Sequence, residues 1–206
     1  MVSEPSEPRR APLALKIVVA GGFGVGKTTT VGAISEIEPL STDAAMTEVG
    51  ADVDCADLTP NKTETTAALD FGRITLADDL VLYLFGTPGQ ERFAFMWDEL
   101  ARGAVGAIVV ADTRRLAESF PAISYFEQRN LPFVIGINCF DGVQLHTVEQ
   151  VREAVAVGDN VPIELFDARD RATVKQLLTV LVECSLGRAR AEVAAAAGPA
   201  SPPHST

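Results

Sequence analysis

One glycine-rich segment of the sequence has the residue types and the spacing of a phosphate-binding loop. The segment is Gly21-x-x-x-x-Gly26-Lys27-Thr28. Glycines leave the backbone free to turn its N–H groups around a phosphate at the positive end of a helix dipole. The lysine reaches the β and γ phosphates, and the threonine hydroxyl is placed to coordinate Mg²⁺. We expect nucleotide contacts from the following residues: Gly21, Gly22, Phe23, Gly24, Val25, Gly26, Lys27, Thr28 and Thr29.

The same residues have a purely structural interpretation, a glycine-rich turn with a helix-capping threonine. The context of the segment argues against it. Leu13 to Ala20 is an apolar run interrupted only by Lys16, the pattern of a strand buried on both faces. Lys27 to Ile34 is predicted to be a helix. A strand, a loop and a helix in this order are what a phosphate-binding P-loop requires.

A second segment has the residue types of a base-binding site. Asn138 and Asp141 lie in Ile135-Gly136-Ile137-Asn138-Cys139-Phe140-Asp141, at the end of a predicted parallel strand. In open α/β sheets, ligands gather at the carboxyl ends of the strands. The alternative is an ordinary Asn/Asp loop that follows a strand.

At this place the sequence resembles the Ras-like small GTPases, which carry an Asn-Lys-x-Asp motif there. The resemblance implies that Asp141 accepts hydrogen bonds from the ring N–H and the exocyclic amine of guanine. Adenine would leave that carboxylate unpaired, at a cost of about 1–3 kcal/mol or more. Cys139 stands where the family has a Lys whose stem covers the base. Asp167-Ala168-Arg169 stands where the family has Ser-Ala-Lys, so the resemblance predicts a bond from the Ala168 N–H to the guanine oxygen.

Gly86-Thr87-Pro88-Gly89-Gln90-Glu91 resembles the second switch region of the family. The resemblance implies that Gly89 donates its N–H to the γ-phosphate and that Gln90 orients the attacking water. Gly86 stands where the family has an Asp that holds Mg²⁺ through water. Asp70 on the neighbouring strand is the alternative source of that carboxylate.

Thr65-Thr66-Ala67-Ala68-Leu69-Asp70-Phe71 resembles the first switch region. Thr66 is in register to coordinate Mg²⁺ when the γ-phosphate is present, and Thr65 is a one-residue alternative. The other interpretation is a pair of threonines that lead into a strand.

The motifs Thr-Thr-x-x-Leu-Asp-Phe-Gly-Arg, Leu-Phe-Gly-Thr-Pro-Gly-Gln and Asn-Cys-Phe-Asp together resemble most closely the conservon-type GTP-binding proteins of actinobacteria. These are relatives of the bacterial gliding and polarity GTPases. The resemblance covers Leu13 to Leu186, and it implies two partners, a roadblock-fold regulator and a sensor-kinase-like protein.

The remaining pattern predicts the fold class. Ala68–Leu76 and Leu80–Phe85 form a predicted hairpin, and three strands then alternate with helical stretches. The strands are Ala104–Ala111, Phe133–Ile137 and Pro162–Phe166, and the helical stretches are Leu116–Arg129, Val148–Val157 and Val174–Arg188. Alternation of this kind predicts an α/β P-loop NTPase fold of small-GTPase type, with a mostly parallel six-stranded sheet, one antiparallel strand and helices on both faces. We expect Leu40 to Pro60 to be a mobile loop.

Length and composition limit the classes of function. The 206 residues predict one domain over residues 13–190 between disordered segments 1–12 and 191–206. A net charge of −11 argues against nucleic acid as a partner, because binding it needs clustered cations. No apolar stretch approaches the ~20 residues that span a bilayer. The three cysteines lack metal-ligand spacing, which favours a cytoplasmic protein, with recruitment to a membrane through partners left open.

The predicted function is that of a GTP-binding switch with Mg²⁺-dependent hydrolysis, in which Lys27, Thr66 and Gln90 are the catalytic residues. Without a supplied arginine, hydrolysis should run at about 10⁻⁴ to 10⁻² s⁻¹. Gly86 and Cys139 favour a second reading, a GTP-binding scaffold that does not hydrolyse, and an ATP-dependent P-loop enzyme is a third. The candidates for an arginine supplied by the chain itself are Arg73, Arg92 and Arg102. The bulky segment Arg92–Trp97 is either helix packing or a partner surface.

Overall fold

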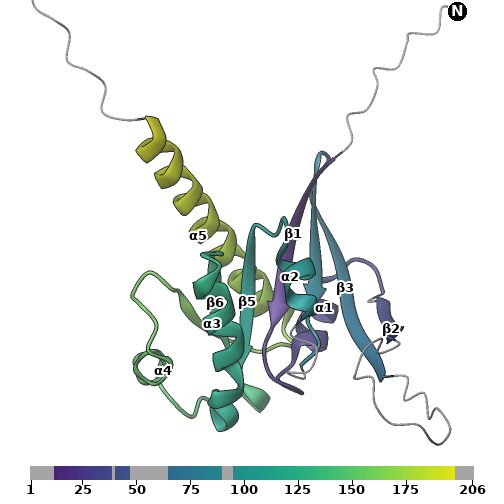
Figure 1. The fold of residues 1–206 in the computed structure, drawn as a ribbon. Helices are drawn as coiled ribbons and strands as arrows, with labels where there is room; N and C mark the ends of the chain where they lie inside the picture. The colour runs from purple at the N-terminus through teal and green to yellow at the C-terminus, as the bar shows by residue number, and fades with distance from the viewer. Residues whose placement is uncertain (1–11, 39, 47–64, 90–94, 198–206) are drawn as a thin grey trace, which may run out of the picture.

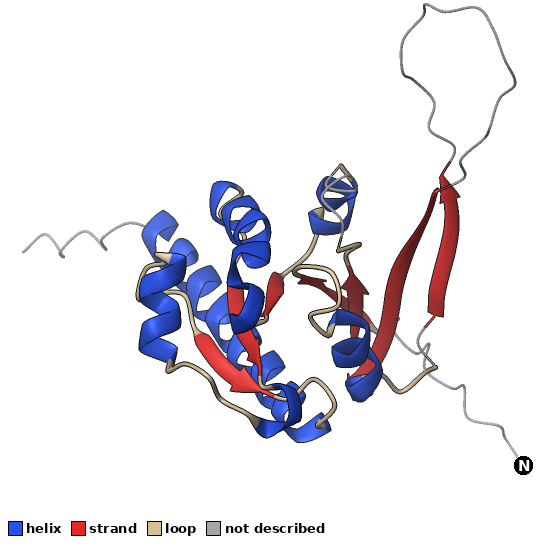
Figure 2. Ribbon diagram, turned by 90° about the horizontal axis from the view of Figure 1, so that it is seen from below, coloured by secondary structure: helices blue, strands red, loops and turns tan. Residues whose placement is uncertain are grey.

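The computed structural model describes residues 12–38, 40–46, 65–89 and 95–197. Its centre is a seven-stranded sheet in the order β2-β3-β4-β1-β5-β6-β7, with helices on both faces (Figures 1 and 2). Only β3 runs antiparallel to its neighbours, because both β2 and β4 pair with it in antiparallel fashion and all other pairings are parallel. The predicted α/β class and the single antiparallel strand are confirmed.

The strands are β1 (Leu13–Ala20), β2 (Leu40–Met46), β3 (Thr65–Ala77), β4 (Leu80–Gly86), β5 (Gly106–Ala111), β6 (Phe133–Asn138) and β7 (Ile163–Phe166). The α-helices are α1 (Lys27–Ile34), α2 (Met96–Ala101), α3 (Phe120–Gln128), α4 (Val148–Val155) and α5 (Arg171–Ala197). Two 3₁₀ helices, η2 (Thr113–Ser119) and η3 (Phe140–Gly142), follow β5 and β6.

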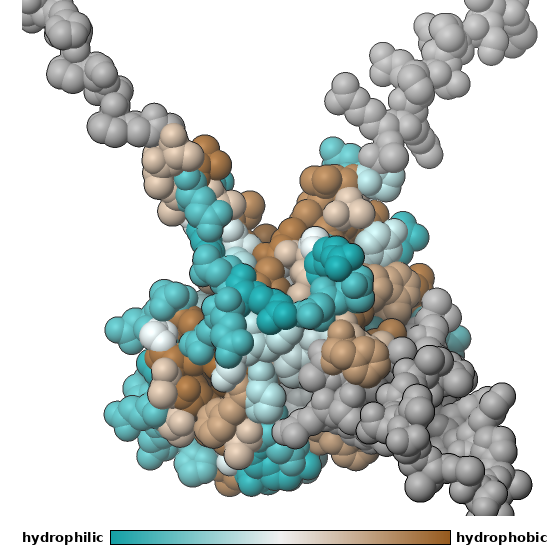
Figure 3. Space-filling view, viewed as in Figure 1, coloured by the Kyte–Doolittle hydropathy of each residue, from teal (hydrophilic) through white to brown (hydrophobic). Residues whose placement is uncertain are grey.

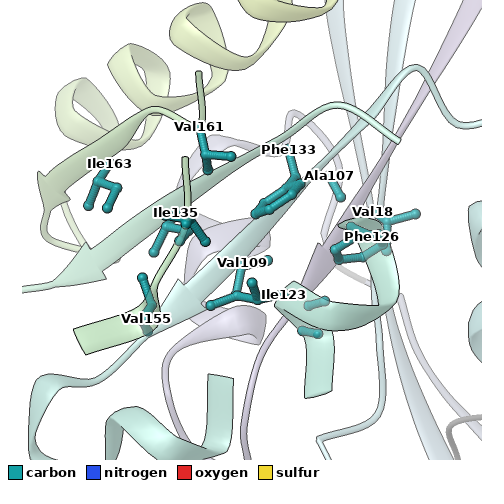
Figure 4. Close-up of a cluster of buried hydrophobic side chains, with 14 of the residues drawn as sticks. Val18, Ala107, Val109, Ile123, Phe126, Phe133, Ile135, Val155, Val161 and Ile163 are labelled. Carbon is teal, nitrogen blue, oxygen red and sulfur yellow. The ribbon is translucent and has the colours of Figure 1, made fainter. Parts of the chain in front are cut away.

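The central strands are buried on both faces, as their continuous apolar runs predict. Along β1, Val18 faces the cluster beneath α2, α3 and α4, whereas Ile17 and Val19 face the cluster beneath α1 and α5. Figure 4 shows the first cluster, in which Phe126 of α3 lies among the side chains of β1, β5 and β6. The two clusters fix the sheet between two helical layers, and the loops at its ends are thereby held in place.

The segment Leu40–Pro60 differs in part from the expectation of a mobile loop. Its first residues form β2, which pairs with β3 from Leu40 opposite Phe71 to Met46 opposite Thr65. This strand is the seventh, where the sequence predicted six. It was missed because its small and polar residues carry no periodic signal, and only the backbone bonds to β3 define it. Figure 2 shows β2 and β3 extending beyond the rest of the sheet.

Helix α5 is longer than predicted and continues to Ala197, where the sequence predicted a disordered tail from Ala191. Alanine has the highest intrinsic helix propensity, so the alanine run propagates the helix beyond the sheet. The projecting end exposes apolar side chains such as Leu186 and Val193, and apolar colour is visible along it in Figure 3. No helix in the described ranges is both long and apolar enough to cross a membrane.

The stretch predicted as one helix from Leu116 to Arg129 is divided. A kink at Arg115 (φ −141°) interrupts η2, and α3 begins at Phe120 with a proline in its first turn. Proline is tolerated there because the first N–H groups of a helix have no partner within it. The division places a short, irregular segment beside the end of β5.

The packing of α5 on the sheet gives a stability prediction. Leu181 is fully buried in the α5 cluster, whereas Leu186 on the same helix is half exposed. Leu181→Ala should lower the free energy of unfolding by about 3 kcal/mol, because it removes buried methyl groups and leaves a cavity. Leu186→Ala should change it by less than about 0.5 kcal/mol. Urea unfolding followed by circular dichroism measures both, and equal losses would contradict this packing.

Candidate nucleotide-binding site

The glycine-rich loop takes up the strand-loop-helix arrangement that its sequence predicts, between β1 and α1. Gly21 has φ 142°, and a Cβ on it would lie 2.3 Å from the Val110 carbonyl oxygen of β5. Gly26 has φ 109° and stands at the N-terminus of α1. Both positions require glycine, the first through close backbone approach and the second through its left-handed conformation. The loop is therefore wrapped tightly against the carboxyl end of the sheet.

Lys27 lies inside the curve of this loop and is 8% exposed. Its Nζ donates to the carbonyl oxygens of Gly22 at 2.6 Å and Gly21 at 3.1 Å. Burial lowers the pKa of Lys27 to about 8, against the opposing influence of Asp70 and Glu118. Gly89 also packs here, since a Cβ on it would lie 2.8 Å from Lys27 Nζ. The structure thus brings Gly89 against the loop, whereas its donation to the γ-phosphate stays a prediction.

Asn138 connects the loop to the other binding segments. Its Nδ2 donates to the Val25 carbonyl at 3.0 Å, and its Oδ1 accepts from the Ala168 N–H at 3.1 Å. The side chain is buried, so both bonds are made away from water. The Ala168 N–H, which was expected to bind the guanine oxygen, already has a protein partner. A base at this position would have to compete with Asn138 for that donor.

Asp141 follows β6 in a left-handed conformation, with φ 56° and ψ 27°. Asp tolerates this conformation better than most residues do. Its side chain is 83% exposed and accepts from Arg169 Nη1 at 3.1 Å. Arg169 also donates through Nε and Nη2 to Asp167, and these hydrogen bonds lower the pKa of Asp167 to about 2. The predicted residues Asp141, Asp167 and Arg169 therefore form one ionic group.

Cys139 and Phe140 directly precede Asp141 in the chain. The backbone N–H of Cys139 donates to the Phe166 carbonyl at 2.7 Å, and burial raises the pKa of its thiol above the ordinary value. The guanidinium of Arg114 lies 4.1 Å from the centre of the Phe140 ring and makes a two-pronged contact with the buried Asp112 at 2.9 and 2.8 Å. An aromatic ring and a planar cation thus stand beside the position where the family's Lys is missing.

The Thr28 hydroxyl expected to coordinate a magnesium ion lies next to Asp70, the alternative source of the carboxylate missing at Gly86. Thr28 Oγ1 donates to Asp70 Oδ2 at 2.6 Å, and Asp70 is buried. Asp70 is opposite Gly86 in the β3–β4 pairing, and a Cβ on Gly86 would lie 2.9 Å from both Asp70 Cβ and Oδ2. The Asp70 carboxylate therefore occupies the space that the glycine leaves. This donor set fits a hard cation, which prefers oxygen ligands.

In the described ranges no cluster of three or more His, Cys, Asp or Glu side chains could hold a metal by itself. Magnesium in nucleotide sites is commonly held by one or two protein oxygens together with phosphate oxygens. A pair such as Thr28 and Asp70 is therefore the kind of protein contribution that a magnesium nucleotide requires.

Comparison with known proteins identifies the family. Residues 19–186 match the family described as conserved hypothetical ATP binding proteins. The chain belongs to this family. An uncharacterised protein of Methanocaldococcus jannaschii is 31% identical over 137 residues, which are 66% of this chain and 76% of that protein. The chloroplastic translation initiation factor IF-2 of Gracilaria tenuistipitata var. liui is 27% identical over 90% of this chain, and the match covers 23% of the factor.

Solved structures with the same fold include a G domain. The G domain of the T. maritima FeoB iron transporter has a TM-score of 0.56 at 17% identity, with 84% of this chain and 99% of that chain covered. The cytosolic domain of the same transporter in a GDP form has a TM-score of 0.60 at 15% identity, over 85% of this chain and 65% of that chain. At such identities the likeness shows the fold. The fold of this family member is accordingly that of a G domain.

The roles of two further predicted residues, Gln90 and Thr66, stay predictions. Gln90 lies outside the described residues, so its position next to Gly89 in the sequence is all that supports its role. Thr66 lies in β3, four positions before Asp70, which corresponds to about 13 Å at the usual rise of a strand. Its expected metal contact requires a different position of β3 relative to Thr28 and stays a prediction, as does the alternative contact by Thr65.

Within the bulky segment Arg92–Trp97, the described residues serve packing in part. Trp97 is buried and stacks with Phe126, whereas Phe95 is exposed. Of the candidate arginines, Arg102 pairs with Glu99 on α2, and Arg92 lies outside the described residues. Arg73 is exposed in the middle of β3, opposite Tyr83. Neither Arg73 nor Arg102 has a hydrogen bond or ion pair to the glycine-rich loop.

The sequence analysis missed a group of charged residues that the structure places at the site: Asp112, Arg114, Arg115 and Glu118. Asp112 directly follows β5 and caps η2, and the other three belong to η2, where the sequence predicts a connection and the start of a helix. Their signal was available, because polar residues that directly follow a buried parallel strand stand at the edge where ligands bind.

The lowered pKa of Lys27 gives a pH prediction. Below about pH 8 the unbound protein carries a charged Lys27, whereas above it the amine is increasingly neutral. Phosphate favours the charged form, so binding above this pH takes up a proton, and affinity should fall by up to about tenfold per pH unit. Calorimetric titration with GDP between about pH 7 and pH 9, in buffers of different ionisation enthalpy, measures both effects.

Lys27→Met is the control for this experiment, because it removes the titrating group and should remove the pH dependence along with much of the affinity. Proton uptake that persists in the variant would assign the effect to another group and contradict the role of Lys27.

Proposed function

We propose that the protein is a guanine-nucleotide-binding switch that hydrolyses GTP slowly with Mg²⁺. The observation that carries the proposal is the position of Asp141. This exposed carboxylate follows β6 in a left-handed conformation, and Asn138 of the same strand is bonded directly to the phosphate loop. A nucleotide whose phosphates occupy the loop would therefore have its base beside Asp141.

Guanine is favoured by the chemistry of this carboxylate. Ionised Asp only accepts hydrogen bonds, and guanine offers two adjacent donors, the ring N–H and the exocyclic amine. Adenine offers an unprotonated ring nitrogen at the corresponding edge, which repels a carboxylate. Arg169 supports the choice, because its bond to Asp141 and its bonds to Asp167 hold the carboxylate in a fixed place.

A second candidate is an adenine-nucleotide enzyme, and the description of the family as ATP binding proteins favours it. The feature that argues against it is the exposed acceptor-only carboxylate of Asp141. If ATP is the ligand, the base must bind without the acceptor pattern of Asp141, and the Arg114–Phe140 pair would supply most of the contact.

Phosphate and metal binding follow from the loop. Lys27 would leave the Gly21 and Gly22 carbonyls to bind the terminal phosphates. Thr28 would hold Mg²⁺ directly. Asp70 would supply the carboxylate that the family carries at the position of Gly86. When bound, the ion would neutralise developing charge on the phosphate oxygens. In the proposal Gln90 orients the attacking water and Gly89 donates to the γ-phosphate. A scaffold that binds GTP without hydrolysis remains the alternative, favoured by the absent carboxylate at Gly86.

The proposal extends to the finer family and to partners. The three sequence motifs that resemble conservon-type GTP-binding proteins support a role in a signalling complex, with a roadblock-fold regulator and a sensor-kinase-like protein as partners. The exposed Phe95, directly before α2 and after the second switch segment, is a surface that such a partner would contact.

Base choice is the first test. Calorimetric titration of nucleotide-free protein should give binding of GDP and GTP at least about tenfold tighter than that of ADP and ATP. Asp141→Ala should remove most of this preference and should also abolish the discrimination between GDP and IDP, which lacks the exocyclic amine. Asp159→Ala, a change of an exposed carboxylate in the loop before β7, should leave both ratios unchanged. Tighter binding of ATP by the unaltered protein would instead establish the adenine-nucleotide reading.

The metal and hydrolysis steps are tested at Asp70. Asp70→Asn keeps an acceptor for Thr28 but removes the charge, so Mg²⁺ should slow GTP dissociation much less than in the unaltered protein, and single-turnover hydrolysis should fall by about tenfold or more. Asp78→Asn, in the exposed turn between β3 and β4, is the matched control. Phosphate release is the readout. GTP that stays intact in the unaltered protein would favour the scaffold reading over the switch.

A further inference from the structure

Arg115 contacts the phosphate loop from outside the segments that bind nucleotide in the proposal. Its Nη2 donates to the carbonyl oxygen of Phe23 at 3.2 Å, and its Nη1 donates to Glu118 Oε1 at 3.2 Å. The kink in η2 falls at Arg115 itself. Asp112 adds a second carboxylate, 3.7 Å from the same guanidinium. The Arg115 side chain thus links the tip of the phosphate loop to two carboxylates, those of Glu118 and Asp112.

Glu118 fixes the other side of this contact. A Cβ on Gly22 would lie 2.3 Å from Glu118 Oε2 and 2.7 Å from Glu118 Cβ, so the acid packs directly on the glycine backbone. Glu118 is also close enough to Lys27 to oppose the lowering of its pKa. The loop is therefore held at two successive residues, Gly22 by packing and Phe23 by a hydrogen bond.

We propose that Arg115 and Glu118 form a clamp that holds the phosphate loop in its binding conformation before nucleotide arrives. The peptide bond between Phe23 and Gly24 is planar and trans, so its C=O and N–H point in opposite directions. Arg115 holds the Phe23 oxygen outward, and this turns the Gly24 N–H toward the interior of the loop, where phosphate binds. Gly24 has φ 69°, and without the clamp this peptide would be free to flip.

The clamp is a positioning device, because Arg115 acts through the backbone of the loop. Its benefit is preorganisation, the removal of ordering costs that binding would otherwise meet. Both side chains are substantially exposed, and exposed ion pairs add little to folding stability. Loss of the clamp should therefore weaken nucleotide binding while the stability of the unliganded protein stays nearly constant.

The inference rests on nucleotide binding at the loop and is independent of the choice of base. The experiment measures dissociation constants of the full-length chain for GDP and GTP, or for ADP and ATP if the unaltered protein prefers adenine. Arg115→Ala should weaken the diphosphate and the triphosphate alike by about tenfold, the loss expected for a hydrogen bond from a charged donor. The ratio of guanine to adenine affinity and the turnover at saturating nucleotide should stay within about twofold of the unaltered protein.

Two further variants make the test specific. Arg115→Lys keeps the charge and one donor nitrogen but loses the two separate nitrogens that reach Phe23 and Glu118. Its affinity for nucleotide should therefore lie between those of the unaltered protein and Arg115→Ala. Arg188→Ala is the control, because Arg188 pairs with Glu192, a carboxylate four residues away on α5, and has no hydrogen bond to the loop. It should bind nucleotide normally.

Three results would overturn the clamp. These are unchanged affinity in Arg115→Ala, a loss confined to the triphosphate or to turnover, and a weakening matched by a lower melting temperature of the unliganded protein. Failure of the proposed function is read separately, from the base preference and hydrolysis of the unaltered protein.

Discussion

The arrangement of the site depends on the buried amide of Asn138. This side chain donates to the Val25 carbonyl of the phosphate loop and accepts from the Ala168 N–H after β7. Because an unpaired buried amide would cost about 1–3 kcal/mol, the three segments that meet there hold one another in position. In the proposed function Asp141, three residues further along the chain, is the carboxylate beside the base, and its place depends on this link. A change at Asn138 should therefore alter the proposed phosphate and base contacts together.

Charge pairing is the second constraint. The chain has a net charge of −11, yet its ligand in the proposal is an anion, so the cations at the site must offset the repulsion between the ligand and the rest of the chain. Each guanidinium there has a carboxylate partner: Arg114 is paired with Asp112, Arg115 with Glu118, and Arg169 with Asp167. Lys27 is the exception, since it bonds to loop carbonyls and has a lowered pKa. It is thus the cation most readily released to phosphate.

Several parts of this arrangement were predictable from local sequence. The glycine-rich motif, the strand before it and the helix after it each carry their own signal, and the alternation of apolar strands with helical stretches led to the α/β class with one antiparallel strand. The same reasoning failed at β2 and at the end of α5. Strand β2 has no periodic pattern and is defined by its backbone bonds to β3. The alanine run after Ala191 is followed by glycine and prolines, a composition that predicts a disordered tail, but the high helix propensity of alanine extends α5 through it.

The sequence by itself determined the chemistry available at each position: a phosphate loop ending in Lys27 and Thr28, and an acceptor at Asp141 that follows a buried strand. These features are local, because glycine conformations and strand burial are set by neighbouring residues. Only the tertiary structure decided which residues meet across the chain. The pairing of β3 with β4 brings Asp70 to Gly86 and to Thr28, and the order β1-β5-β6 brings Arg115 to the loop tip. Such contacts depend on the register and the order of the strands. Neither is encoded in the residues of a single strand, because both are set only when the strands pair in the sheet.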